Sequence, residues 1–217
     1  MAILFGWFNS VRHARRQIND LVRKTEYAEL ELQRKTGELQ TLRKGITPDE
    51  TRSFWHAGLE GTNLASMTIS SKSNAFQRAS FVDCNLRDTS LSGGASSFQE
   101  ARFDGANLQG ATLVGGVVSF QNASFVKSDL TRAKLTGSAN SFQLTSFEEA
   151  TLVDAVLVGS FQRVNLSGAI LSGADLSGIA STDLETCYFK QPPTYNAQTK
   201  FPAGFDPVQQ QWRKVSE

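Results

Sequence analysis

A bulky apolar residue recurs at a fixed interval from Phe54 to Leu176, and this spacing constrains the fold more than any other feature of the sequence. The interval is five residues for three steps and usually seven for the fourth, so the pattern repeats every 22 residues. A small residue stands two places before the bulky one in most units. The bulky positions are Phe54, Leu59, Leu64, Ile69, Phe76, Phe81, Leu86, Leu91, Phe98, Phe103, Leu108, Leu113, Phe120, Phe125, Leu130, Leu135, Phe142, Phe147, Leu152, Leu157, Phe161, Leu166, Leu171 and Leu176.

A flat strand cannot hold this pattern, because its side chains alternate between two faces with a period of two. A chain that turns a corner every five residues does hold it. Four units then complete one square turn, and each turn hydrogen-bonds to the next. One large and one small side chain from every side point to the centre. We expect the two Phe columns to lie on adjacent walls and the Leu and Ile columns on the other two.

The fourth corner of the turn differs from the other three. In four turns it carries two extra residues, as in SGGASS (92–97), VGGVVS (114–119) and TGSANS (136–141). We expect these insertions to stack into a ridge along one edge of the prism. The step from Leu157 to Phe161 is instead shortened to four residues.

Individual units resemble a known family. ANLQG (106–110), SDLTR (128–132), VNLSG (164–168) and ADLSG (174–178) are similar to the pentapeptide repeat, whose pattern is roughly A-[DN]-[LF]-x-x. The resemblance covers residues 54–190 and implies an all-β solenoid, a right-handed quadrilateral β-helix of about six to seven turns. Members in cyanobacteria and chloroplasts are often associated with photosynthetic membranes, so the resemblance also implies that setting.

The segment before the repeat has a different pattern. Residues 1–46 combine an apolar tip with a long basic helix, expected over 11–44, whose apolar residues follow a three-four spacing. Its narrow apolar stripe favours a coiled-coil or docking helix. Two alternatives stay open: the helix folds back along the solenoid, or it is disordered until bound.

Short elements are expected at the two ends of the repeat. Thr47, Pro48 and Glu50 predict a capping helix at 47–53 that covers the first turn. Residues 191–217 contain four prolines and are expected to form an irregular cap and tail. The aromatic residues expected to cover the far end are Phe189, Tyr195, Phe201, Phe205 and Trp212.

The first candidate interaction site is the apolar tip with the basic residues that follow it. Its side chains suit the headgroup region of a membrane, with the arginines on anionic lipid in a weak and reversible contact. They also suit a groove on a partner protein, and the alternative is burial against the chain itself. The residues are Ile3, Leu4, Phe5, Trp7, Phe8, Arg12, Arg15 and Arg16.

The second candidate site is a column of glutamines on one wall. The triplet S-F-Q recurs in register, so the amides stack and can hydrogen-bond along the solenoid axis. Such a ladder either steadies the wall or also serves as a flat polar interaction strip. The residues are Gln77, Gln99, Gln121, Gln143 and Gln162, and Trp55 takes the same place in the first turn.

Composition and motifs argue against an enzyme. The two histidines, His13 and His56, lie in different segments, and the repeat places Cys84 and Cys187 nearly five turns apart. We therefore expect two separate buried thiols, no metal site and no cofactor. No phosphate-binding loop, dinucleotide motif or nucleophile elbow is present. A filled core leaves no cavity for a small-molecule substrate.

These observations favour a non-enzymatic scaffold. The expected partner is a membrane-associated protein complex, met on the cytoplasmic side of a membrane, the thylakoid if the source is cyanobacterial. The alternative is a DNA mimic that binds and protects a type II topoisomerase, a role of other members of the family. Mimicry needs a dense negative surface, whereas residues 46–217 carry thirteen basic and sixteen acidic residues, so we expect no role in nucleic-acid recognition.

Overall fold

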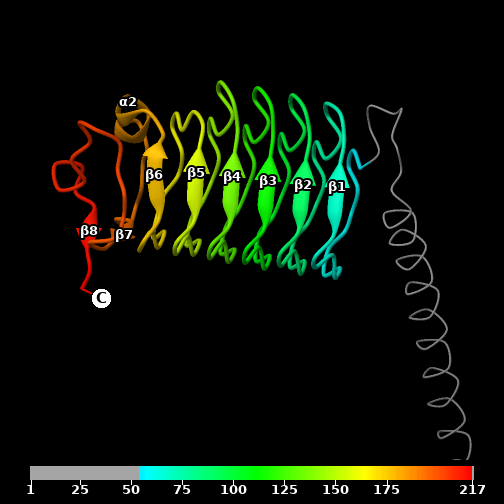
Figure 1. Cartoon of the computed structure of the whole chain (residues 1–217), viewed down its shortest axis with the longest axis horizontal. Coiled ribbons are helices and arrows are strands. Elements are labelled where there is room, and N and C mark those ends of the chain that lie inside the picture. Colours follow the sequence, from blue (N-terminus) through cyan, green and yellow to red (C-terminus); the bar gives the residue numbers. More distant parts are fainter. Residues whose placement is uncertain (1–53, 217) are drawn as a thin grey trace, which may run out of the picture. The chain divides into compact units, whose positions relative to one another are not determined.

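The computed structural model describes residues 54–216, which form a parallel β-solenoid of about seven turns (Figure 1). The fold class predicted from the spacing is therefore confirmed. The expected tip and helix of residues 1–46 and the capping helix of residues 47–53 lie outside the described residues.

One wall of the solenoid is a six-stranded parallel sheet, which we call the sheet wall. Its strands follow one another in chain order, and Leu91 pairs with Leu113, which reproduces the repeat found in the sequence. The register shifts only between the last two strands, after the shortened step. The strands are β1 (Thr68–Ser70), β2 (Ser90–Ser92), β3 (Thr112–Val114), β4 (Lys134–Thr136), β5 (Val156–Val158) and β6 (Asp175–Gly178).

Two of the other walls are joined by single parallel bridges, and the third, that of Phe76, by backbone hydrogen bonds between turns. On one wall Ser80 pairs with Arg102, and on the next Asn85 pairs with Asn107. On the wall of Phe76, its N–H donates to the carbonyl of Ser97 at 2.8 Å. Backbone groups are thus paired between turns on all four sides, so the square cross-section follows from one ladder per side.

The apolar columns fill the centre as predicted. All 24 bulky positions are buried except Phe54 and Ile69, which are half-buried in the first turn. Neighbouring rings within a Phe column stack with centroids 4.7–5.1 Å apart over the first five turns, and rings of the two columns meet at 6.1–6.4 Å. The two Phe columns therefore lie on adjacent walls. Burial of these rings and of the Leu columns is the main favourable term for the fold.

The corner after the second Phe column shows how the chain turns. Asp83, Lys127 and Glu149 adopt φ angles of 54°, 57° and 55°, and Gly105 and Gly168 take 66° and 65° at the same corner. A residue with a positive φ lets the chain turn the corner from one wall to the next. It costs about 1–2 kcal/mol for a residue with a Cβ, which burial of the adjoining core residues offsets.

The backbone ladder continues beyond residue 190, contrary to the expectation of an irregular tail. Tyr188, Thr194 and Lys200 bridge to the turn before them. The strands β7 (Thr194–Tyr195) and β8 (Arg213–Lys214) then pair in parallel. Prolines are tolerated here because a proline still has a carbonyl, and that of Pro193 accepts the N–H of Arg213 at 2.9 Å.

Two further features complete the last turn. A short helix, α2 (Ser181–Glu185), replaces the bulged corner and buries Leu184. The expected aromatic cluster forms at this end, with Phe201 centred 5.4–5.6 Å from the rings of Tyr195, Phe205 and Trp212. Phe189, the fifth residue of that expectation, is half-buried.

Candidate protein-interaction surface

The structure describes the residues of one of the two candidate sites. Ile3, Leu4, Phe5, Trp7, Phe8, Arg12, Arg15 and Arg16 lie outside the described residues. The glutamine column lies on the wall of Phe76, which we call the Gln wall. Each glutamine directly follows a core phenylalanine, so the stacked rings fix the spacing of the amides.

Four of the five glutamines form a continuous ladder, which we call the Gln ladder. The Nε2 of Gln77 donates to Oε1 of Gln99 at 2.8 Å, and Gln99 donates to Gln121 at 2.8 Å. Gln121 then donates to Gln143 at 2.7 Å. All four side chains are half-buried. Strands stacked about 4.8 Å apart bring identical amides within hydrogen-bond distance of one another along the axis, so each glutamine donates to the next one in the column.

The ladder ends at Gln143. Gln162 occupies the next rung and is half-buried, but among residues 54–216 its amide makes no hydrogen bond to Gln143. The cause lies in the shortened step, because the ring of Phe161 is tilted by 39° against Phe142, whereas earlier rings of the column are nearly parallel. In the first turn Trp55 is 43% exposed and packs edge-on against His56.

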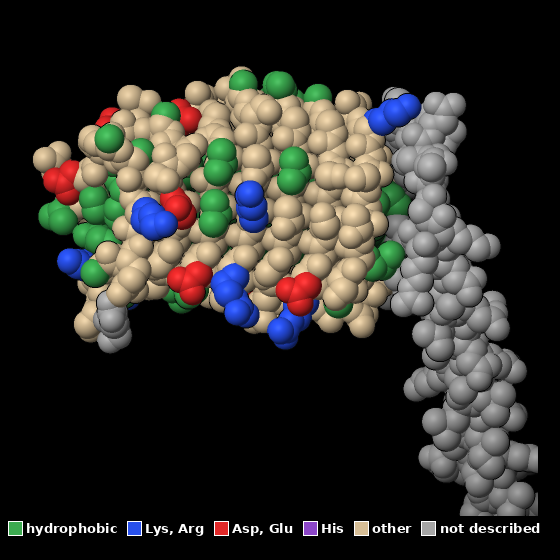
Figure 2. Space-filling model, viewed as in Figure 1, with side chains coloured by type: hydrophobic (Ala, Val, Ile, Leu, Met, Phe, Trp, Pro, Cys, Tyr) green, Lys and Arg blue, Asp and Glu red, His purple; other side chains and the backbone are tan. Residues whose placement is uncertain are grey.

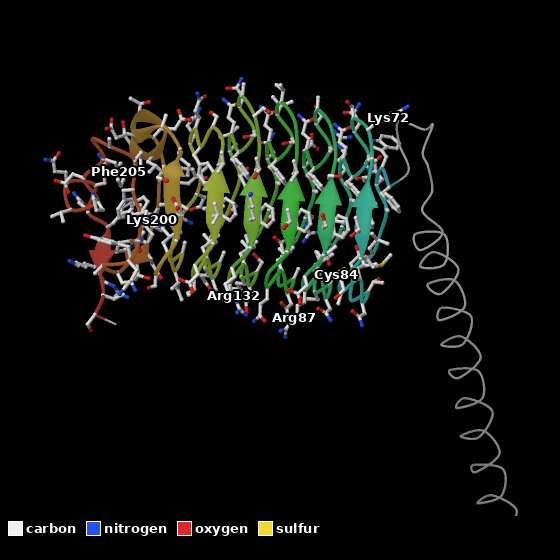
Figure 3. The ribbon with its side chains drawn as sticks, in the orientation of Figure 1. Lys72, Cys84, Arg87, Arg132, Lys200 and Phe205 are labelled. Carbon is white, nitrogen blue, oxygen red and sulfur yellow. The ribbon has the colours of Figure 1, made fainter. Side chains whose placement is uncertain are left out.

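Charge is distributed unevenly around the prism. Between Ser71 and Ser160 there are fifteen charged residues. Eleven of them lie on the walls of Phe81 and Leu86 or at the corner that follows each, which is the side of the prism opposite the ridge. In Figure 3, Arg87 and Arg132 lie at the lower edge of the sheet wall and Lys72 at the top. Figure 2 shows the same face, with charged side chains gathered along its lower edge. Over the same stretch, the Gln wall carries no ionisable side chain between its two corners.

Many of the charges are neutralised locally. At the corner of the Gln wall, Arg78 and Glu100 form an ion pair of 2.7 Å. Arg102 and Asp104 on the neighbouring wall lie 3.1 Å apart. The other ion pairs among the described residues are Arg87–Asp88, Lys127–Glu149 and Lys200–Asp175. Surface pairs of this kind contribute little stability, but the two opposite charges of each pair cancel, so the local net charge of the surface is small.

A second amide contact was not predicted from the sequence. On the wall of Leu86, Asn85 donates to Asn63 at 3.0 Å, and Gln109 donates to Asp129 at 2.6 Å. Partial burial tends to raise the pKa of Asp129, but hydrogen bonds from Thr131 and Gln109 outweigh it and leave the pKa below its ordinary value. The Asn that directly precedes each of the first three leucines of this column, Leu64, Leu86 and Leu108, is the signal that could have indicated this contact.

The bulged corners form the predicted ridge, made of residues 71–74, 93–96, 115–118 and 137–140. Its backbone is itself paired between turns: the N–H of Gly116 donates to the carbonyl of Gly94 at 3.0 Å, and the N–H of Val118 to that of Ala139 at 3.1 Å. A Cβ at Gly116 would lie 2.9 Å from the backbone nitrogen of Ala95. Glycine is needed here because the rungs approach so closely.

The two thiols are free and separate, as predicted. Cys84 is buried and donates to the carbonyl of Leu59 at 2.8 Å. Cys187 is half-buried as a residue, but burial of its sulfur raises its pKa to about 12. Within residues 54–216 no group of His, Cys, Asp and Glu is arranged to hold a metal ion, and no helix has the length and apolar character to cross a bilayer.

Two sequence families match the repeat region of the chain. Pentapeptide repeats (9 copies) match residues 76–124, and Pentapeptide repeats (8 copies) match residues 141–179. The chain is a pentapeptide-repeat protein. Comparison with curated proteins gives no match.

Solved structures of pentapeptide-repeat proteins are similar to this one at low sequence identity. QnrB1, a plasmid-mediated fluoroquinolone resistance protein, is 15% identical, with 69% of this chain and 86% of that chain covered and a TM-score of 0.31. Rfr23 from the cyanobacterium Cyanothece 51142 is 20% identical, with 66% and 90% covered and a TM-score of 0.23. HetL from Nostoc sp. strain PCC 7120, involved in heterocyst differentiation regulation, is 15% identical, with 76% and 89% covered and a TM-score of 0.18.

Proposed function

We propose that this pentapeptide-repeat protein is a non-enzymatic scaffold. Its N-terminal residues dock onto a membrane-associated multi-subunit assembly, and its β-solenoid serves as a platform for protein interactions. The assembly lies on the cytoplasmic side of its membrane and is photosynthetic if the source is cyanobacterial. The observation that carries the proposal is the uncharged Gln wall with its continuous Gln ladder.

The ladder suits a docking surface because it is already ordered. Each side chain is held by its neighbours, so binding of a partner does not cost the entropy of fixing flexible glutamines. The half-buried amides retain unused hydrogen-bonding capacity, since each carbonyl oxygen has two lone pairs and each NH₂ has two hydrogens. A neutral surface also binds without the desolvation cost of unpaired charges.

The N-terminal residues supply the other half of the proposal. Ile3, Phe5 and Trp7 are large apolar residues whose burial in a partner groove or a headgroup layer is favourable. Arg12, Arg15 and Arg16 follow within eight residues of Phe8 and would meet acidic groups on a protein or anionic lipid. Three arginines give modest attraction, so the apolar contact provides most of the specificity.

The topoisomerase alternative gains no support from the charge of the solenoid. Residues 54–216 carry twelve Lys and Arg and thirteen Asp and Glu, and several of the acids are paired with bases at 2.7–3.6 Å. A surface that imitates DNA needs negative charges at high density. We therefore do not extend that function to this chain.

Co-purification from gently solubilised membranes of the source cells tests the docking step. The full chain is compared with a Phe5→Ser, Trp7→Ser, Phe8→Ser variant, and with Lys35→Gln as a control elsewhere in the basic N-terminal segment. We expect membrane association and bound proteins to be lost together in the triple variant only. If both persist in the triple variant, the N-terminal docking is wrong.

A matched pair of variants tests the platform. Gln99→Lys places a charge within the Gln ladder, whereas Gln109→Lys places the same charge on the wall of Leu86. Circular dichroism verifies that both variants are folded. We expect the first variant to lose bound proteins while it stays on the membrane, and the second to keep them. Equal retention by both variants would remove the Gln wall from the proposal.

A further inference from the structure

The ridge ends abruptly in the middle of the solenoid. Its fourth rung, Gly137–Asn140, is followed one turn later by a corner with no bulge, because only three residues separate Leu157 from Phe161. The sequence shows what is missing. Leu135 to Phe142 reads LTGSANSF and Leu157 to Phe161 reads LVGSF, so the later corner matches the earlier one without its Ser-Ala-Asn, apart from Val158 in place of Thr136. In Figure 1 the loop beside β4 rises above the loop beside β5.

This ending leaves one backbone donor without the partner that its counterparts have. The N–H of Ser96 donates to Val117 at 3.0 Å and that of Val118 donates to Ala139 at 3.1 Å, each across to the next rung. Asn140 holds the same position on the last rung, and its φ of 51° matches the 50° of Val118. Within residues 54–216 no acceptor meets the Asn140 N–H, and the residue is exposed.

One backbone acceptor on the same rung is also underused. The carbonyls of Gly94 and Gly116 each accept an N–H from the rung that follows, at 3.0 and 3.4 Å. Among the described residues, the equivalent carbonyl of Ser138 accepts only the N–H of Ser141 in its own turn, at 3.3 Å. The donor of Asn140 and the acceptor of Ser138 are therefore spaced as in a parallel ladder that lacks its next strand.

The shortened corner does not fill this place. Its Ser160 hydroxyl donates to the carboxylate of Asp183 in α2 at 2.9 Å, and the N–H of Phe161 donates to the same oxygen at 3.0 Å. The side-chain hydroxyl and the next backbone N–H are thus turned towards α2. The open strand edge consists of Ser138, Ala139 and Asn140, all exposed, and we call it the ridge edge.

The geometry points to the ridge edge as a docking site for an extended segment of a partner protein, which adds a parallel strand as the fifth rung of the ridge. Strand addition to an open edge supplies affinity through main-chain hydrogen bonds. Here the segment donates one N–H to the Ser138 carbonyl, and its next residue accepts the Asn140 N–H. The inference rests on the platform role proposed above and is independent of N-terminal docking.

The chemistry of the occupant follows from the ladder that it continues. Rungs two to four of the ridge contain only Gly, Ala, Ser, Val and Asn, and the sheet wall and Gln wall beside them carry almost no charge. A charged residue in the added strand would lose hydration there without gaining an opposite charge. The occupant is therefore expected to have about three consecutive small, uncharged residues, since close rungs exclude larger side chains.

Nuclear magnetic resonance of the full chain tests the proposal with a defined probe. The probe is the capped peptide Thr-Gly-Ser-Ala-Asn-Ser, which copies residues 136–141 and so represents the missing rung. We expect it to shift the Asn140 amide resonance and to slow its hydrogen exchange at least fivefold. The amides of Ser96 and Val118 are the matched controls, because they hold the same position on closed rungs and should not change.

Two changes establish that binding occurs by strand pairing. Methylation of the peptide nitrogen at its first serine removes the N–H directed at Ser138 and should weaken binding at least tenfold. Insertion of Ser-Ala-Asn between Gly159 and Ser160 gives the chain its own fifth rung and should abolish binding, with an unchanged melting temperature as the check on folding.

The proposal is overturned if the peptide fails to bind, or binds equally after either change. It is also overturned if Asn140 becomes protected with rising protein concentration alone, since the occupant is then a second copy. None of these outcomes depends on the co-purification result.

Discussion

Replacement of a ladder glutamine by glutamate tests both the direction and the strength of the Gln ladder. Glutamate has nearly the same shape, but its carboxylate has no proton to donate. In Gln121→Glu the carboxylate still accepts from Gln99, but the bond donated to Gln143 at 2.7 Å is lost and two oxygens face each other. In Gln143→Glu the carboxylate keeps the acceptor role that Gln143 has in the ladder.

The two variants are therefore expected to differ in stability. Loss of one neutral hydrogen bond costs about 0.5–1.5 kcal/mol. The opposed oxygens add to this cost, although a half-buried side chain relieves part of it by turning to water. We expect Gln121→Glu to lower the free energy of unfolding by about 1–2 kcal/mol at pH 7, which is about 2–8 °C in Tm for a chain of this size. Gln143→Glu should be neutral or slightly stabilising, because its bond becomes charge-assisted.

The pH dependence gives the decisive readout. When the carboxyl introduced by Gln121→Glu is protonated, it can donate to the Gln143 carbonyl, so folding favours the neutral form. The pKa of this carboxyl in the folded protein should therefore rise above its usual value of about 4.3. The lost stability should be absent in acid and appear as the pH rises through the folded-state pKa. Thermal melts at pH 3.5 and 7.5, each relative to the parent protein, measure it. Equal effects of the two variants at pH 7.5, or a penalty for Gln121→Glu that persists at pH 3.5, would refute the reasoning.

Three other perturbations test the core, the ridge and the thiol. Phe120→Ala should lower the unfolding free energy by about 3–5 kcal/mol in denaturant titrations, because the ring is fully buried and stacked at 4.9 and 4.7 Å; a loss below about 1 kcal/mol would contradict a filled centre. Gly116→Ala should cost about 1–3 kcal/mol through its contact with Ala95. Gly58→Ala, whose Cβ would meet only the end of the flexible Glu60 side chain at 3.1 Å, should cost less, and comparable melting curves for the pair would count against a tight ridge. Because burial raises its pKa to about 12, Cys187 should resist iodoacetamide at pH 8 until the protein unfolds; stoichiometric labelling of the native protein would show otherwise.

The spacing of apolar residues was sufficient to predict the solenoid and most of the Gln ladder. A large residue every fifth position allows few backbone paths, and residues one repeat apart in the sequence then lie one above another. The sequence alone therefore predicts that Gln77 contacts Gln99, and the two side chains are hydrogen-bonded. The ladder is a consequence of register, and register is what the sequence specifies most strongly.

The deviations from the pattern arise where the register changes. Gln162 falls out of the ladder because the shortened step rotates the unit that carries it. The last turn could not be recognised from the sequence because its insertions differ in length from corner to corner. The chain from Asn165 to its partner Tyr188 is shorter than the chain from Asp175 to its partner Lys200. Pairing between distant residues survives such insertions, but a fixed period in the sequence does not. The apolar tip at Ile3–Phe8 has no repeat to constrain it, and its role stays a prediction.

Because the repeat is regular, the length of the solenoid is set by its number of turns. Each turn adds one rung of about 4.8 Å and contacts only the turns on either side of it. Duplication or loss of one whole turn would move the two ends of the solenoid apart or together by that step, while the pairing within every other turn stays as it was. A lineage of such proteins can therefore adjust the distance between two docked partners in fixed increments by copying a short stretch of its gene, without redesigning either end.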